Sequence, residues 1–170
     1  SARYSSASWI DANGNLMLFG GYGTDKNGSW GYLNDLWKYN TSTNVWTWVS
    51  GDDIVNQPGA YGSKGIGSIS NKPGARHYAT GSIDANDNIW IFGGDAFDKN
   101  GSQGYVNDLW KYEIATNRWT WVSGGDVVYQ NGVYNTKCFE YTSNLELGEL
   151  VLDLFIFSFF EELRPDWNIC

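Results

Sequence analysis

Few side chains in this sequence could do nucleophilic or metal chemistry. A Ser-His-Asp or Cys-His arrangement needs an imidazole base, and the only histidine is His77. We expect His77 to be a surface or packing residue at the start of a strand. Cys138 and Cys170 lack the Cys-x-x-Cys spacing of a metal site, and two cysteines alone do not predict a disulfide. The sequence therefore predicts no catalytic residue, no metal and no cofactor.

A short Asp-Lys-Asn-Gly-Ser segment occurs twice, at 25–29 and at 98–102. Its alternating acids and amides are found in some Ca²⁺-binding loops, but the bidentate glutamate that closes such a loop is missing. Asp and Asn before a glycine also close ordinary tight turns. We interpret both segments as turns.

Aromatic and acidic side chains that follow two Gly-Gly pairs are better candidates for binding. The candidates are Tyr22, Trp30 and Tyr32 after the first pair, and Asp95, Phe97 and Tyr105 after the second. We expect these segments to be loops, where ligand selection is commonly located. Exposed rings beside polar groups suit protein contacts and sugar stacking alike; the alternative is that the rings only cover a sheet edge. Arg3 and Arg76 could meet an acidic ligand or pair with a neighbouring aspartate.

An internal repeat with an offset of 73 residues organises these candidates. Ala2-Arg3 recurs as Ala75-Arg76, and Phe19-Gly20-Gly21 recurs as Phe92-Gly93-Gly94. The longest matching segments are Asn-Asp-Leu-Trp-Lys-Tyr at 34–39 and 107–112, and Trp-Thr-Trp-Val-Ser-Gly at 46–51 and 119–124. The chain is therefore two copies of one unit, followed by a different tail.

Each copy predicts four short strands. Asn13-Gly14 is a strong hairpin signal between the first two strands, because both residues tolerate positive φ. We expect the double glycine to end the second strand, and a loop of about a dozen residues to lead to the third. The expected strands are 5–11, 15–19, 35–39 and 45–49 in copy one, and 78–84, 88–92, 108–112 and 118–122 in copy two.

The composition supports a β-rich globular protein. Aromatic residues make up 17% of the 170 residues and 21 are glycine, as expected for short strands joined by tight turns. A net charge of −8 argues against binding to nucleic-acid phosphates. The longest apolar run, 150–160, is about half of what a membrane-spanning helix needs, and no signal peptide is visible. The sequence leaves the cellular compartment open, with an extracellular or cell-surface location as one alternative.

The order of these elements resembles the kelch repeat: a hydrophobic stretch, Gly-Gly, Asn-Asp-x-Trp-x-Tyr, then Asn-x-Trp. The resemblance covers about residues 2–137 and implies an all-β fold of two four-stranded antiparallel propeller blades. A closed propeller typically has about 4–8 blades, so two blades imply a partial propeller that needs further blades of the same chain or self-association. Galactose-oxidase-like enzymes share such blades, but their copper chemistry needs paired histidines that this sequence lacks.

We divide the chain into blade 1 (1–73, including a long connection at 52–73), blade 2 (74–137) and a divergent tail (138–170). Read in another frame, the codons of 144–148 can spell Pro-Gly-Ala-Arg, the sequence at 73–76. The tail is therefore interpreted as the frameshifted remnant of a third blade. The alternative is a genuine terminal segment that caps the open end.

Kelch propellers hold ligands on the loops at their two ring faces. The resemblance therefore implies a non-catalytic scaffold that recognises a protein partner. The alternatives are a carbohydrate-binding propeller, a blade array with a purely structural role, or part of an oxidase or epimerase whose catalytic residues lie outside this sequence.

Overall fold

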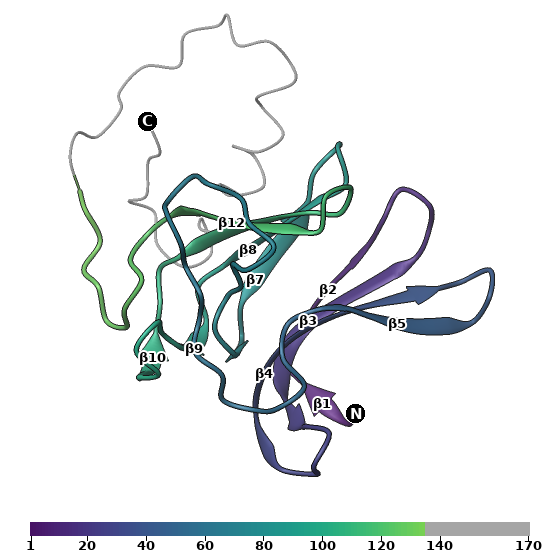
Figure 1. The fold of residues 1–170 in the computed structure, drawn as a ribbon, viewed down its shortest axis with the longest axis horizontal. Helices are drawn as coiled ribbons and strands as arrows, with labels where there is room; N and C mark the ends of the chain where they lie inside the picture. The colour runs from purple at the N-terminus through teal and green to yellow at the C-terminus, as the bar shows by residue number, and fades with distance from the viewer. Residues whose placement is uncertain (135–170) are drawn as a thin grey trace, which may run out of the picture. The chain divides into compact units, whose positions relative to one another are not determined.

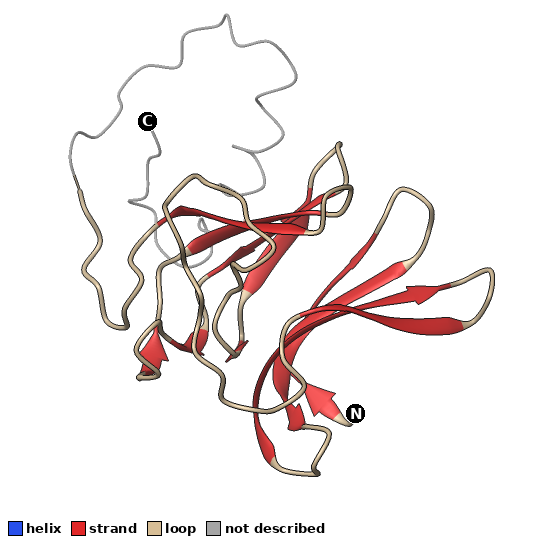
Figure 2. Ribbon diagram, viewed as in Figure 1, coloured by secondary structure: helices blue, strands red, loops and turns tan. Residues whose placement is uncertain are grey.

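The computed structural model describes residues 1–134 and shows an all-β protein with no helix in that range (Figures 1 and 2). The chain divides into two units, Ser1–Gln130 and Asn131–Cys170, and all the described strands belong to the first. The predicted fold class is confirmed. The blade limits at 73 and 137 stay predictions, and the tail from 138, with its frameshift hypothesis, lies outside the described residues.

Copy one forms a single antiparallel sheet. Its strands are β1 (Arg3–Tyr4), β2 (Ala7–Ile10), β3 (Leu16–Thr24), β4 (Trp30–Asn40) and β5 (Val45–Ser50). The order is β1-β3-β4-β5, and β2 pairs with β3 next to β1.

The double glycine does not end the second strand of copy one, as the sequence had predicted. Strand β3 continues to Thr24, and its register against β4 shifts between Phe19 and Gly21. Gly20 and Gly21 have φ of +61° and +98°, so they form a β-bulge that bends the strand without breaking it. The expected loop of a dozen residues is thereby reduced to the turn at 25–29.

Copy two divides the same elements between two sheets. One has the order β12-β11-β8-β7, formed by Arg118–Ser123, Leu109–Glu113, Asn88–Phe92 and Thr80–Ile83. The other has the order β10-β9-β6, formed by Gln103–Tyr105, Asp95–Phe97 and Arg76–His77. Here Gly93 and Gly94 do separate two strands, although their φ values nearly equal those of Gly20 and Gly21.

One core joins the two copies. Met17 and Phe19 of copy one pack with Ile89, Trp110 and Trp119 of copy two, and each of these side chains is at least 98% buried. The connection between the copies also enters this core, because Tyr61 belongs to it. The same connection lies beside β12, where Ser68 forms an isolated β-bridge with Trp119.

Candidate binding site

A row of aromatic rings crosses the first sheet beyond its bulge. Tyr22 of β3 lies between Tyr4 of β1 and Tyr32 of β4, since both pair with it in register. Register partners in an antiparallel sheet point to the same side. The Tyr22 ring centroid is 5.4 Å from that of Tyr4, 5.7 Å from that of Tyr32 and 6.1 Å from that of Trp30.

Copy two supplies the polar half of the site. The Tyr32 ring lies 4.4 Å from the ring of His77 and 5.6 Å from that of Phe97. The Tyr32 hydroxyl donates to Asp95 Oδ2 at 2.7 Å and accepts a hydrogen bond from Gln103 Nε2 at 2.7 Å. We name Tyr4, Tyr22, Trp30, Tyr32, His77, Tyr78 and Asp95 the aromatic site.

The candidate residues lie on strands, and the expectation that they lie in loops is wrong. Tyr22 belongs to β3, Trp30 and Tyr32 to β4, Asp95 and Phe97 to β9, and Tyr105 to β10. In copy one the bulge at Gly20 and Gly21 lets β3 continue to Tyr22, whereas in copy two a separate sheet of β6, β9 and β10 carries the candidates. In Figure 1, β1, β9 and β10 lie at the same end of the molecule, at the bottom of the view.

Sequence reasoning left His77 out of the site, although the structure places it at the centre. Its ring is within 4.4 Å of both Tyr32 and Tyr78, and it pairs in register with Asp95. The repeat held the signal that could have found it: His77 and Asp95 occupy the positions of Tyr4 and Tyr22, where copy one places two stacked rings.

Buried polar atoms remain without partners in this site. His77 Nε2 lies 3.5 Å from Asp95 Oδ2, while His77 Nδ1 and Asp95 Oδ1 have no hydrogen-bond partner among the described residues. Burial raises the pKa of the Tyr32 hydroxyl, and its hydrogen bond to Asp95 raises it further, so Tyr32 stays a neutral donor. An unsatisfied acceptor beside aromatic rings is a group that a ligand's donor can satisfy.

The rim of the site is open to solvent. Tyr4, Trp30 and Tyr78 are 53%, 56% and 68% exposed. Tyr105 pairs in register with Asp95 and extends the row outward, where its ring lies 6.3 Å from that of Tyr129. The structure thus brings together all six candidate residues that follow the glycine pairs.

Arg3 and Arg76 each pair with an aspartate, the second of the two roles considered for them. Arg3 holds Asp35 through two hydrogen bonds of 2.6 and 2.7 Å. Arg76 holds Asp108 in the same way at 2.7 and 2.8 Å, with both side chains fully buried. Arg76 is therefore a core residue, enclosed away from the exposed rim of the aromatic site.

The Asp-Lys-Asn-Gly-Ser segments are closed turns. Asp25 Oδ1 accepts hydrogen bonds from the backbone N–H groups of Asn27 and Ser29, and Asp98 makes the equivalent bonds in copy two. The backbone N–H groups of Val55 and Val128 donate to the Oδ2 atoms, so both oxygens of each carboxylate accept hydrogen bonds within the protein. Across residues 1–134 there is no cluster of three His, Cys, Asp or Glu side chains arranged for a metal, and no helix able to cross a membrane.

Comparisons with known proteins found a similar sequence motif and a similar fold. Residues 2–53 match the family model of the Kelch motif. The fold is similar to the solved structure titled "Structure of YjhT", a kelch-type propeller protein, with a TM-score of 0.51 and 18% identity over 72% of this chain. The match covers 38% of that chain, so this protein spans well under half of its length. No curated protein matches the sequence significantly.

Proposed function

We propose that this chain, an all-β protein with a kelch motif and the fold of a kelch-type propeller, is a binding module that presents the aromatic site to a protein partner. One observation carries the proposal. Three aromatic side chains that are each more than half exposed surround a buried polar centre, formed by Tyr32, Asp95 and His77. That the chain has no catalytic machinery of its own stays a prediction.

Exposed aromatic side chains are effective binding anchors. Trp and Tyr bury a large area while they lose few rotamers, and they are enriched among the residues that dominate interface energies. Trp30 lies beside Tyr22 in copy one and Tyr78 lies beside His77 in copy two, with ring centroids 6.1 and 4.4 Å apart. A partner segment that spans the site would contact both exposed rings.

The charge of the site favours a basic group on the partner. Asp95 Oδ1 has no hydrogen-bond partner among residues 1–134, and the whole chain carries a net charge of −8. An arginine of the partner could stack its guanidinium on the exposed Trp30 ring and, once the side chains that cover Asp95 Oδ1 shift, donate to that carboxylate, because guanidinium groups pack on aromatic faces and pair with carboxylates. We therefore propose an arginine-containing peptide segment as the preferred ligand.

A carbohydrate is the second candidate ligand. Aromatic faces stack on sugar rings, and the polar group of Tyr32, Asp95 and Gln103 beside them could bond hydroxyl groups. Asp95 favours the peptide, because its carboxylate attracts a cation more strongly than a hydroxyl group.

A peptide display library and a glycan array, both probed with the purified chain, separate these candidates. We expect the selected peptides to contain arginine. Their affinity for the Trp30→Ala variant of the chain should be about 30-fold lower than for the unaltered chain. Trp48→Ala is the matched control, since Trp48 is 47% exposed but lies on β5, outside the site. Glycan binding that depends on Trp30 would replace the peptide proposal. Binding that resists both Trp30→Ala and Tyr78→Ala would refute the site.

A further inference from the structure

Each copy of the repeat has an equivalent face on its main sheet, but within residues 1–134 only the face of copy two is buried by other parts of the chain. We call this the leading face and define it in copy one by Ile10, Leu16, Leu18, Tyr39 and Trp46, which share one side of the sheet through their register pairs. Their counterparts in copy two are Ile83, Ile89, Ile91, Tyr112 and Trp119.

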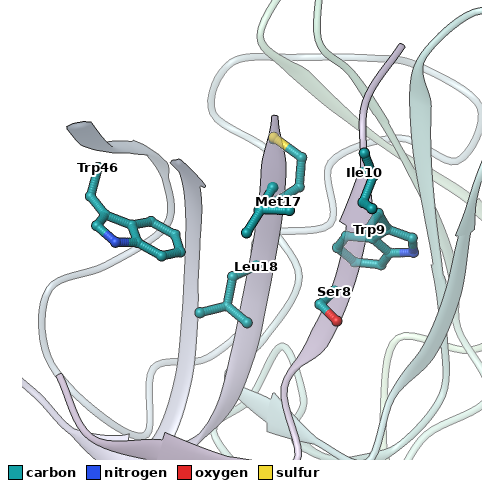
Figure 3. Close-up of a pocket in the computed structure, with 7 residues that line it drawn as sticks. Ser8, Trp9, Ile10, Met17, Leu18 and Trp46 are labelled. Atoms are coloured by element: carbon teal, nitrogen blue, oxygen red, sulfur yellow. The ribbon is translucent and has the colours of Figure 1, made fainter. Parts of the chain in front are cut away.

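The two leading faces differ in their exposure to solvent. Ile89, Ile91 and Tyr112 are fully buried, and Trp119 is 2% exposed. In copy one, Leu16 is 40% exposed, Trp46 48% and Ile10 62%. The leading face of copy one also holds a groove of about 430 Å³, which is lined by Ile10, Leu18 and Trp46 from three strands (Figure 3). An apolar face of this kind is typical of an interaction surface.

The leading face of copy two is covered by the opposite side of the copy one sheet. Phe19 packs against Trp119 with ring centroids 5.4 Å apart, and Ser50 Oγ accepts a hydrogen bond from Trp119 Nε1 at 3.1 Å. The connection between the copies covers the edge strand β12, where the N–H of Ser68 donates to the carbonyl of Trp119 at 3.1 Å. Within residues 1–134, no segment pairs with the corresponding outer edge of β5.

The repeat places the matching surface on the same chain. Trp9 and Met17, which are buried against copy two, correspond to Ser82 and Trp90 on the far side of copy two, where both are partly exposed. We call Ser82 and Trp90 the trailing face. The covering connection also recurs in the sequence, with Gly59, Tyr61 and Lys64 matched by Gly132, Tyr134 and Lys137.

We propose that copies of this chain associate head to tail, with the trailing face of one copy covering the leading face of the next. The occupant is a second copy because its trailing face derives from the same repeat as the surface that covers Ile89 and Trp119 within one chain. The two faces differ, so the interface is heterologous and builds a ring or an open chain of copies. Closure at about 4–8 blades needs roughly two to four copies.

Sedimentation of the 170-residue chain, with one variant for each face, tests this proposal. Leu16→Asp places a charge in the leading face and Trp90→Glu in the trailing face. Ile69→Asp is the control, because Ile69 is 81% exposed and belongs to neither face. We expect the unaltered chain and the control to form oligomers, and each face variant to raise the dissociation constant about 30-fold or more.

Mixing the two face variants gives the sharper result. Each variant retains one intact face, so an equimolar mixture should form a dimer of one chain of each kind and nothing larger. If Leu16→Asp proves unfolded by circular dichroism, Trp46→Lys replaces it, since Trp46 is nearly half exposed. A monomeric unaltered chain at high concentration would overturn the proposal, as would a Trp90→Glu variant that assembles like the unaltered chain.

Discussion

Replacement of Asp108 by asparagine should destabilise the protein far more than the same change at Asp35. The two aspartates occupy the same position in the repeat, and each pairs with an arginine through two hydrogen bonds. Asp108 Oδ2 also accepts hydrogen bonds from Tyr61 at 2.6 Å and Trp110 at 2.7 Å. Among the described residues, Asp35 Oδ2 accepts only one bond of this kind, from Trp37 Nε1 at 2.6 Å.

The expected loss follows from the enclosure of Arg76. Asparagine can keep one oxygen facing Tyr61 and Trp110, but its amide group then faces the guanidinium, and a fully buried positive charge is left without its counter-ion. Breaking such a buried pair costs about 3–5 kcal/mol. For a chain of this size the loss lowers the melting temperature by roughly 6–20 °C. Asp35→Asn should cost about 1–3 kcal/mol, because each side chain of its pair keeps 8% exposure where those of Arg76 and Asp108 keep none, and because Asp35 has one donor fewer.

Urea unfolding at pH 7, followed by tryptophan fluorescence, measures both variants. Burial alone would raise the pKa of Asp108, but the Arg76 charge and the hydrogen bonds outweigh it and hold the pKa below its ordinary value. The contribution of Asp108 is therefore present above about pH 4 and is lost as the pH falls through the lowered pKa. Equal losses in the two variants, or a loss under about 1 kcal/mol for Asp108→Asn, would refute this reasoning.

Three further predictions concern local features. Burial opposes ionisation of Asp11, but hydrogen bonds from Lys38 and Asn15 lower its pKa to about 2. Asp11→Asn should therefore remove about 2 kcal/mol of unfolding free energy at pH 7 and make stability less dependent on pH between 4 and 2, as urea titrations would show. Trp119→Ala should cost about 3–5 kcal/mol, whereas exposed Trp46→Ala should cost under about 1 kcal/mol; equal melting temperatures would contradict this. Gly21→Ala should destabilise more than Gly14→Ala in thermal melts, because a Cβ at Gly21 would clash with Ser6 Oγ and the Tyr4 carbonyl, whereas a Cβ at Gly14 would meet no atom of the described residues.

Local signals predicted the strands of both copies. The Asn-Gly turn acts over a few residues and the repeat over a fixed offset, so the four main strands in each copy lie close to their expected positions. The extension of β3 past Gly21 was missed because a double glycine with positive φ can either end a strand or form a bulge. The hydrogen bonds to the facing strand β4 decide between these outcomes.

The candidate site was predicted in part for a related reason. The places of Tyr22, Trp30 and Asp95 after the glycine pairs indicated them, because segments between regular strands commonly select ligands. The contact between His77 and Tyr32 joins strands of different copies, and no short-range pattern encodes it. Tyr61 was missed for the same reason, since its partner Asp108 lies in the next copy.

The hydrogen bond from Tyr61 to Asp108 makes copy two depend on the connection that precedes it. The connection that follows copy one completes the buried arginine pair of copy two through Tyr61, and Asp35 in copy one has no such tyrosine among the described residues. Stability in repeat proteins depends on neighbours, and here the dependence runs from the N-terminal copy to the C-terminal one. Shortening such an array from its start should therefore weaken the copy that becomes first, whereas shortening it from its end leaves every remaining arginine pair complete.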